Sequence, residues 1–123
     1  MAIKKILIID DSPTDRAFLS EVLSQAGYEC LEADNAEAGL ASARELHPDL
    51  ILMDVVMPGL NGFQAARMLS RDDATRHIPV FMATARGQPT DEIWGRRQGA
   101  VEYLVKPLRA DDLLARIRSL KAA

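Results

Sequence analysis

Five polar residues of this sequence each stand at the end of a short apolar run, and their side chains have complementary chemistry. They are Asp10, Asp11, Asp54, Thr84 and Lys106. Three carboxylates brought within several ångströms of one another repel, so a proton or a cation has to neutralise them. Because all their donor atoms are oxygen, the set favours a hard divalent cation such as Mg²⁺.

A site of this kind has the right charge for a phosphoryl group. Three carboxylates and Mg²⁺ sum to 2 − 3 = −1, and the Lys106 ammonium brings the total to zero. A carboxylate is a competent nucleophile toward phosphorus, and the product is an aspartyl phosphate. Asp54 stands alone at the end of its run and is the best candidate for the nucleophile, while Thr84 offers a hydrogen bond to the phosphoryl oxygens.

The elements that must position these residues follow from hydrophobic spacing. Apolar runs predict strands at 6–9, 28–33, 50–53, 80–83 and 101–105. Segments with helical apolar spacing lie between them. Five such units with short links predict a parallel sheet with helices on both faces. Ligands of open parallel sheets bind at the carboxyl ends of the strands, so the five polar residues are expected at one edge. Taken singly, each acid is more typical of a helix cap or turn, and only their convergence favours a site.

Polar residues and glycines mark the expected helix ends. Ser12 is a predicted N-cap, with Pro13 in the first helical position and Asp15 adding favourable charge to the first turn. Gly27 stands where a left-handed helix stop is expected. Later caps or turns are predicted at Asp34, Asn35, Asn61 and Asp91.

Composition bounds the class of protein. The chain has 123 residues, 48% of them hydrophobic, which predicts one domain over residues 1–123. Its net charge of −3 excludes a broadly basic surface for nucleic acid, and one cysteine excludes an internal disulfide. The apolar runs are too short to span a membrane, and the first five residues lack the features of a signal peptide. We therefore expect a cytoplasmic protein with no nucleic-acid or membrane partner.

Motifs along essentially the whole chain resemble the receiver domain of bacterial two-component response regulators. The matching segments are Ile9-Asp10-Asp11-Ser12, Asp49 to Asp54, Met57-Pro58-Gly59, Asn61-Gly62, Ala83-Thr84-Ala85, Gly99-Ala100 and Tyr103 to Pro107. Each is weak alone, but together, in this order and spacing, they are highly specific. The resemblance implies a flavodoxin-like (βα)5 fold, an α/β three-layer sandwich whose parallel five-stranded sheet has the order 2-1-3-4-5. It also implies a single receiver domain without an output domain.

The resemblance also implies roles for the acidic residues. Asp54 is the implied phosphoacceptor, which takes a phosphoryl group from a histidine kinase. Asp10, Asp11 and Asp54 are implied to hold Mg²⁺, and the backbone carbonyl of Val56 completes the protein ligands. Such a protein catalyses only its own phosphorylation and dephosphorylation, so it is not an enzyme with a diffusing substrate.

The implied switch lies on the last two strands. Thr84 and Lys106 are implied to contact the phosphoryl oxygens, and the bond between Lys106 and Pro107 is expected to be cis. Tyr103 matches the aromatic residue that swings inward when Thr84 moves toward the phosphoryl group. This small displacement is expected to bias a surface formed by the fourth helix, fifth strand and fifth helix, which binds a downstream protein.

Two positions that tune hydrolysis in receivers carry unusual residues here. Val56 lies two residues beyond Asp54 and cannot hydrogen-bond an attacking water. Arg86 lies two residues beyond Thr84. It either forms a charge-assisted bond to the phosphoryl group or points into solvent, and the sequence leaves both open.

The segment 93–100 is similar to that of stand-alone receivers in twitching-motility chemosensory pathways, which implies a chemotaxis-like kinase. Three other functions remain open. The protein is alternatively a phosphate sink that drains the kinase, or a scaffold that is never phosphorylated, although the intact acids argue against the latter. A phosphatase with an aspartyl intermediate is the third, but such enzymes often have a second aspartate where Ser12 stands.

Four further residues have simpler interpretations. Trp94 is either an anchor for a partner or packs against a neighbouring helix. Cys30 is predicted to be a buried small hydrophobic residue. His47 and His77 precede strands and are assigned to turns or solvent.

Overall fold

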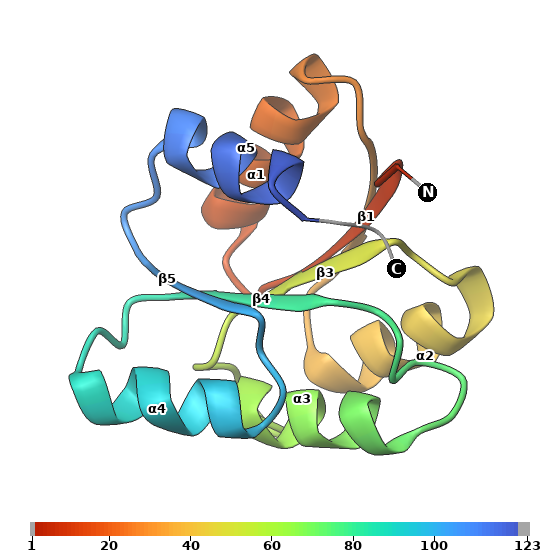
Figure 1. The fold of residues 1–123 in the computed structure, drawn as a ribbon, viewed down its shortest axis with the longest axis vertical. Coiled ribbons are helices and arrows are strands. Elements are labelled where there is room, and N and C mark those ends of the chain that lie inside the picture. Colours follow the sequence, from red (N-terminus) through yellow and green to blue (C-terminus); the bar gives the residue numbers. More distant parts are fainter. Residues whose placement is uncertain (1, 121–123) are drawn as a thin grey trace.

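The computed structural model describes residues 2–120, in which five parallel strands form one sheet with helices on both faces (Figure 1). The elements are β1 (Lys5–Ile9), α1 (Pro13–Gln25), β2 (Glu29–Ala33), α2 (Ala36–Leu46), β3 (Leu50–Met53), α3 (Gly62–Arg71), β4 (Val80–Thr84), α4 (Pro89–Arg97), β5 (Glu102–Val105) and α5 (Ala110–Arg118). The sheet order is β2-β1-β3-β4-β5, and all neighbouring strands are parallel. The predicted flavodoxin-like α/β sandwich is therefore confirmed.

The predicted strands agree with the observed ones to within one residue. β1 begins one residue earlier than predicted, β2 and β5 begin one residue later, and β4 continues to Thr84. Among residues 2–120, every helix is too short or too polar to cross a membrane.

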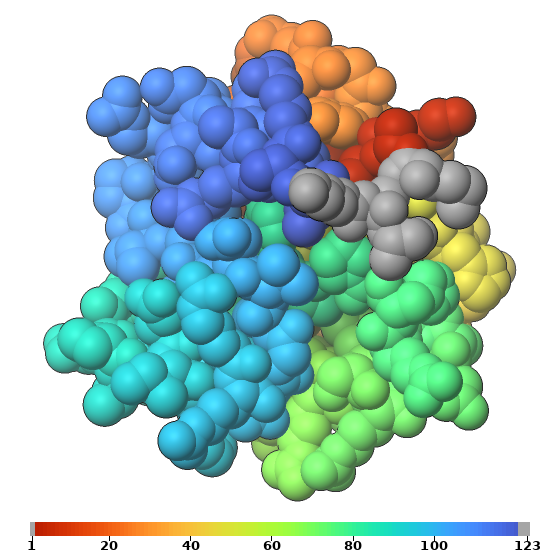
Figure 2. Space-filling view, in the orientation of Figure 1, coloured from red at the N-terminus to blue at the C-terminus, as the bar shows by residue number. Residues whose placement is uncertain are grey.

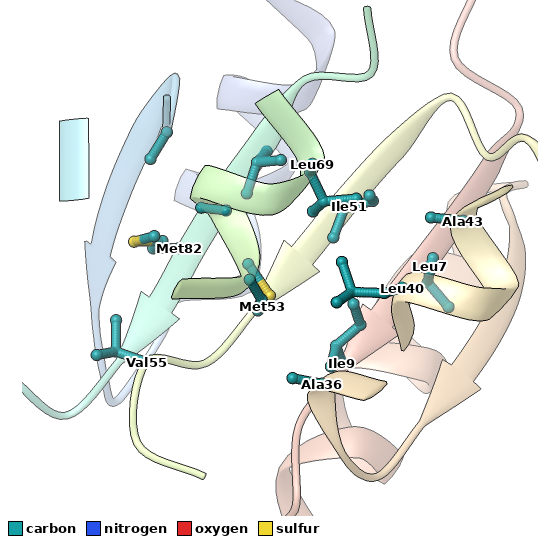
Figure 3. Close-up of a cluster of buried hydrophobic side chains, with 14 of the residues drawn as sticks. Leu7, Ile9, Ala36, Leu40, Ala43, Ile51, Met53, Val55, Leu69 and Met82 are labelled. Carbon is teal, nitrogen blue, oxygen red and sulfur yellow. The ribbon is translucent and has the colours of Figure 1, made fainter. Parts of the chain in front are cut away.

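Alternate residues of the central strands face opposite layers of helices. Leu7 and Ile9 of β1 belong to the apolar cluster under α2 and α3, whereas Ile6 and Ile8 belong to the one under α1 and α5. Figure 3 shows the first cluster, in which the Leu40 side chain of α2 lies near Ile9 of β1. Complete burial of one such aliphatic side chain stabilises the fold by about 1.5–3 kcal/mol. Burial on both faces explains why these runs are continuously apolar.

Most of the predicted helix ends are confirmed. The Ser12 hydroxyl accepts a hydrogen bond from the amide of Asp15 at 3.2 Å, and Asn35 caps α2 in the same way. Asn61 begins α3 with a reciprocal capping box. Gly27 has a φ of 97°, in the left-handed region expected after α1.

The prediction that Asp91 caps or turns the chain before the fourth helix is wrong. α4 begins two residues earlier, at Pro89, whose fixed φ suits the first helical position. Asp91 therefore lies inside the first turn, where its buried side chain forms an ion pair with Arg86 at 2.8 Å.

The start of α3 packs closely against the end of β3. A Cβ atom at Gly62 would lie 2.8 Å from Val55 Cα and would also clash with the backbone carbonyl of Asp54. The Gly62 amide donates a hydrogen bond to the Val55 carbonyl at 2.8 Å. Glycine at this position thus lets the helix approach the backbone that carries Asp54.

We expect Gly62→Ala to lower the free energy of unfolding by about 2–3 kcal/mol, because the obstructing atoms belong to the backbone. Chemical denaturation measures the change. Gly87→Ala is the matched control: a Cβ there lies 3.0 Å from Cγ1 of the exposed Val105, which can move aside. The control should lose less than about 1 kcal/mol. Equal losses in the two variants would contradict the role given to Gly62.

Candidate functional site

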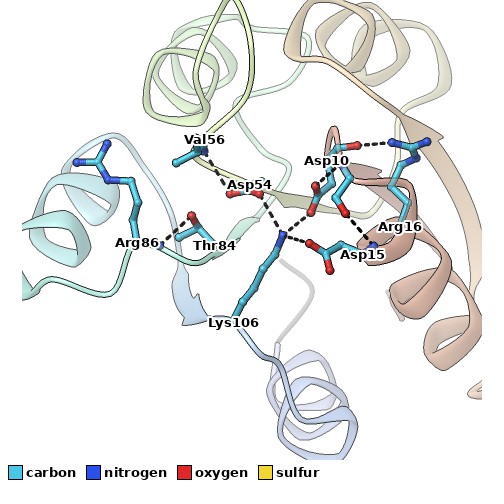
Figure 4. A network of polar contacts seen from close by, with 9 residues as sticks. Asp10, Asp15, Arg16, Asp54, Val56, Thr84, Arg86 and Lys106 are labelled. Atoms are coloured by element: carbon cyan, nitrogen blue, oxygen red, sulfur yellow. Dashed lines mark hydrogen bonds and ion pairs between the residues drawn. The ribbon is translucent and has the colours of Figure 1, made fainter.

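The carboxyl ends of β1, β3, β4 and β5 meet at one edge of the sheet and bring the predicted polar residues together (Figure 4). Asp10 directly follows β1, and Asp54 directly follows β3. Thr84 ends β4, and Lys106 follows β5. The convergence inferred from the parallel strands is therefore present.

Three acids form a group able to hold a cation. Carboxylate oxygens of Asp10, Asp11 and Asp54 lie within 4.8 Å of one another. Asp10 and Asp54 are buried, and Asp11 is exposed. Oxygen-only donors at this spacing, two of them shielded from water, fit a hard divalent ion such as Mg²⁺. Val56 lies beside them, and its amide donates to Asp54 Oδ1 at 3.2 Å.

The ammonium of Lys106 is shared by three carboxylates. Its Nζ lies 2.7 Å from Asp10 Oδ2, 2.7 Å from Asp15 Oδ2 and 3.0 Å from Asp54 Oδ2. Burial opposes the ammonium charge, but these hydrogen bonds outweigh it and place the pKa of Lys106 above its ordinary value. The lysine is therefore fully charged near neutral pH. The peptide bond between Lys106 and Pro107 is cis.

Asp15 is the residue of this site that sequence reasoning missed. Its place after Ser12 and Pro13 predicts only a favourable charge in the first turn of a helix. The available signal was its position, because the first turn after β1 lies at the same edge as Asp10. With Asp15 included, four carboxylates and one ammonium sum to 1 − 4 = −3, so a divalent cation leaves −1. The neutral total expected from the sequence is wrong by this one charge.

Asp10 is surrounded by donors. Its Oδ1 accepts from the Ser12 amide at 2.9 Å, and its backbone carbonyl accepts from the Arg16 guanidinium at 2.7 Å. Burial raises the pKa of the Asp10 carboxyl above its usual range, although the bonds from Lys106 and Ser12 favour the ionised form. The buried carboxylate thus depends on nearby positive charge.

Arg86 is exposed, and its side chain also has a partner that the sequence does not predict. Its guanidinium turns away from Asp54 (Figure 4), forms the ion pair with Asp91 and lies 5.7 Å above the ring of Phe63. Only its backbone faces the site, where the Arg86 amide donates to the buried Thr84 hydroxyl at 3.3 Å. The sequence does not predict this pairing, because aspartate is a common cap residue and its pairing with Arg86 depends on where α4 begins.

Tyr103 connects this loop to β5. The side chain is buried, and its hydroxyl donates to the Arg86 carbonyl at 2.6 Å. Burial, together with the negative charge of Asp91, raises the pKa of Tyr103 to about 12. Gly95 of α4 makes room for the ring, since a Cβ there would lie 2.8 Å from Tyr103 Cδ1.

The structure also tests the predictions for Trp94, Cys30 and the two histidines. Trp94 is 49% exposed and lines an open hollow of about 440 Å³ with Phe63 and Arg86, so its interpretation as a packed residue is wrong. Cys30 is half-buried. His47 ends α2 in a left-handed turn, and His77 is exposed, as expected for turn and solvent roles.

Comparisons with known proteins agree with this geometry. The family model of the response regulator receiver domain matches residues 6–118. The chain is 49% identical over 118 residues to Protein PilH of Pseudomonas aeruginosa, covering 96% of this chain and 98% of that protein. It is 42% identical over 117 residues to the phosphate regulon transcriptional regulatory protein PhoB of the same organism, covering 95% of this chain and 51% of PhoB.

Solved structures of similar proteins have the same fold as this chain. The Vibrio cholerae chemotaxis protein CheY4 superposes with a TM-score of 0.90 at 32% identity, covering 98% of this chain and all of that one. A putative response regulator from Chloroflexus aurantiacus also has a TM-score of 0.90, at 33% identity, covering 94% of this chain and 95% of that one. With the family model matching residues 6–118 and a carboxylate cluster at the edge of the sheet, the chain belongs to the response regulator receiver domain family.

Proposed function

We propose that this receiver domain is a signalling switch controlled by phosphorylation of Asp54. The observation that carries the proposal is the place of the Asp54 carboxylate. It is buried at the end of a central strand, shares the Lys106 ammonium with Asp10, and lies beside the oxygens of Asp10 and Asp11. A carboxylate held among positive charges and metal ligands is suited to attack phosphorus.

The phosphoryl donor is a histidine kinase, as for receiver domains generally. An Asp54 carboxylate oxygen forms the new bond to phosphorus while the phosphorus–nitrogen bond of the donor phosphohistidine breaks, and the imidazole keeps the bonding electron pair. Lys106 neutralises charge on the phosphoryl oxygens, and the Thr84 hydroxyl donates to one of them. The carboxylates of Asp10, Asp11 and Asp54 and the Val56 carbonyl would hold Mg²⁺, which would supply the remaining positive charge.

The signal leaves the site through Thr84. When its hydroxyl turns to the phosphoryl group, it loses its bond from the Arg86 amide, and the loop after β4 shifts. The same loop holds Tyr103 through the Arg86 carbonyl, so the shift reaches β5 and α4. A small local displacement thereby changes a binding surface.

The downstream partner binds the face formed by α4, β5 and α5. Figure 2 shows α4, in cyan, adjoining the light blue segment around β5 on the surface. The large apolar side chains exposed in this region include Ile93, Val101 and Val105, which are 54%, 42% and 47% exposed. Exposed apolar groups of this kind suit a protein partner and favour an output regulator over a phosphate sink.

We assign the protein to a chemotaxis-like pathway in the cytoplasm that controls twitching motility. The similarity to PilH and to the chemotaxis protein CheY4 supports this assignment. So does the resemblance of the segment 93–100 to stand-alone receivers of such pathways.

Treatment with a small phosphodonor and Mg²⁺ should add one phosphoryl group to the wild type and none to Asp54→Ala, as measured by intact mass. Asp34→Ala removes an exposed carboxylate at the same edge of the sheet and should be modified like the wild type. Chelation of Mg²⁺ should prevent modification of every variant. Equal modification of the wild type and Asp54→Ala would refute the proposal.

Val56→Asn should speed hydrolysis of the aspartyl phosphate about two- to tenfold, the equivalent of one net hydrogen bond of about 1 kcal/mol to the attacking water. Loss of the phosphoryl mass over time gives the rate. Val56→Leu is the control and should keep the wild-type rate, because leucine offers no hydrogen bond. An unchanged rate for Val56→Asn would show that water positioning is not limiting.

Tyr103→Phe removes the bond to the Arg86 carbonyl and should separate phosphorylation from the response of α4. We expect normal phosphoryl uptake but a smaller change in Trp94 fluorescence, since Trp94 lies beside Arg86 in the hollow. Tyr28→Phe alters the other tyrosine and should leave the fluorescence change intact. A full response from Tyr103→Phe would exclude this route.

A further inference from the structure

The hydrogen-bond donors of Lys106 are fully used in this structure. An ammonium group has three N–H bonds, and three carboxylates accept from it, those of Asp10, Asp15 and Asp54 (Figure 4). The side chain of Lys106 is only 15% exposed, so water has little access to it. Any new acceptor of Lys106 must therefore displace one of these carboxylates.

The three acceptors differ in how easily they can be displaced. The side chains of Asp10 and Asp54 are 2% and 10% exposed, and a buried carboxylate that loses its partner is costly. The side chain of Asp15 is 42% exposed, so water can replace the ammonium there. Asp15 is thus the acceptor that Lys106 can leave at the lowest cost.

The backbone holds Asp15 in place for this contact. Its amide donates to the Ser12 hydroxyl at 3.2 Å, which fixes the first turn of α1. The group of carboxylates spaced for a shared cation comprises Asp10, Asp11 and Asp54, and Asp15 is not a member of it. Within this site, Asp15 therefore contacts the lysine. Its carboxylate adds the negative charge that a divalent cation and Lys106 leave unbalanced.

We propose that Asp15 is a positioning residue that holds Lys106 in the unphosphorylated protein and releases it to the phosphoryl group. The proposal rests on the proposed phosphorylation of Asp54. In the free protein, Asp15 takes one donor of Lys106 and adds a negative charge that repels the incoming phosphoryl group. Once Asp54 is phosphorylated, a phosphoryl oxygen takes over that donor, and the Asp15 carboxylate is hydrated instead. Asp15 therefore slows phosphorylation.

The test compares initial rates of phosphorylation by a small phosphodonor at saturating Mg²⁺. Asp15→Asn keeps the shape of the side chain and removes its charge, and its rate should rise about three- to tenfold, since a tenfold change corresponds to about 1.4 kcal/mol. Asp15→Glu restores a carboxylate and should return the rate toward that of the wild type. Asp34→Asn removes one exposed charge after β2 and should have the wild-type rate.

Mg²⁺ affinity provides a readout that needs no phosphodonor. In Asp15→Asn, a neutral amide oxygen replaces the carboxylate and attracts Lys106 less strongly. Lys106 then binds the metal ligands Asp10 and Asp54 more strongly, while the site also loses a negative charge. Calorimetric titration should therefore show Mg²⁺ binding weakened about three- to tenfold, with Asp34→Asn unchanged. A purely structural role of Asp15 would alter thermal stability but neither of these quantities.

The two proposals fail in different ways. If the wild type takes up no phosphoryl group, the proposed function fails, and the Mg²⁺ titration still decides whether Asp15 holds Lys106. If the wild type is phosphorylated but Asp15→Asn matches it in rate and in Mg²⁺ affinity, the role of Asp15 is overturned. Equal gains in rate for Asp15→Asn and Asp34→Asn would also overturn it, because the effect would then come from net charge alone.

Discussion

The structure of this site depends on one ammonium group shared by carboxylates from three different segments. Lys106 lies at the end of β5, Asp54 at the end of β3, and Asp10 and Asp15 at the end of β1 and the start of α1. Without Lys106, two buried carboxylates would face each other without compensation, at a high cost. Lys106 holds the carboxylates of Asp10 and Asp54 close together, and the proposed cation site and phosphoryl transfer both depend on this proximity.

The same arrangement connects the site to a distant surface. The Arg86 backbone lies between two hydroxyl groups: its amide donates to Thr84, and its carbonyl accepts from Tyr103. Its side chain is held outside the site by Asp91 and Phe63. This loop is therefore anchored on both sides, and in the proposed function a change at Thr84 moves it. A packed contact of this kind passes a small shift on to its neighbours.

Sequence reasoning was most accurate where neighbouring residues decide the outcome. The strands and the caps at Ser12, Asn35 and Asn61 depend on spacing and on hydrogen bonds within a few residues. It failed where a charged side chain had several partners within reach. Asp91 is a typical cap residue, yet Pro89 begins the helix earlier, and the carboxylate then meets Arg86 instead. Which partner such a side chain pairs with depends on how two elements pack against each other.

The sequence by itself determined the order of the elements and the edge at which the acids, Thr84 and Lys106 meet, because parallel strands align their carboxyl ends. Only the tertiary structure decided which carboxylates share the lysine. Asp10 and Asp15 stand 96 and 91 positions from Lys106 along the chain, and both reach it at 2.7 Å. The physical reason is that hydrogen bonds act over about 3 Å. They therefore depend on how helix, strand and loop are placed in space, and the spacing of residues along the sequence does not determine that placement.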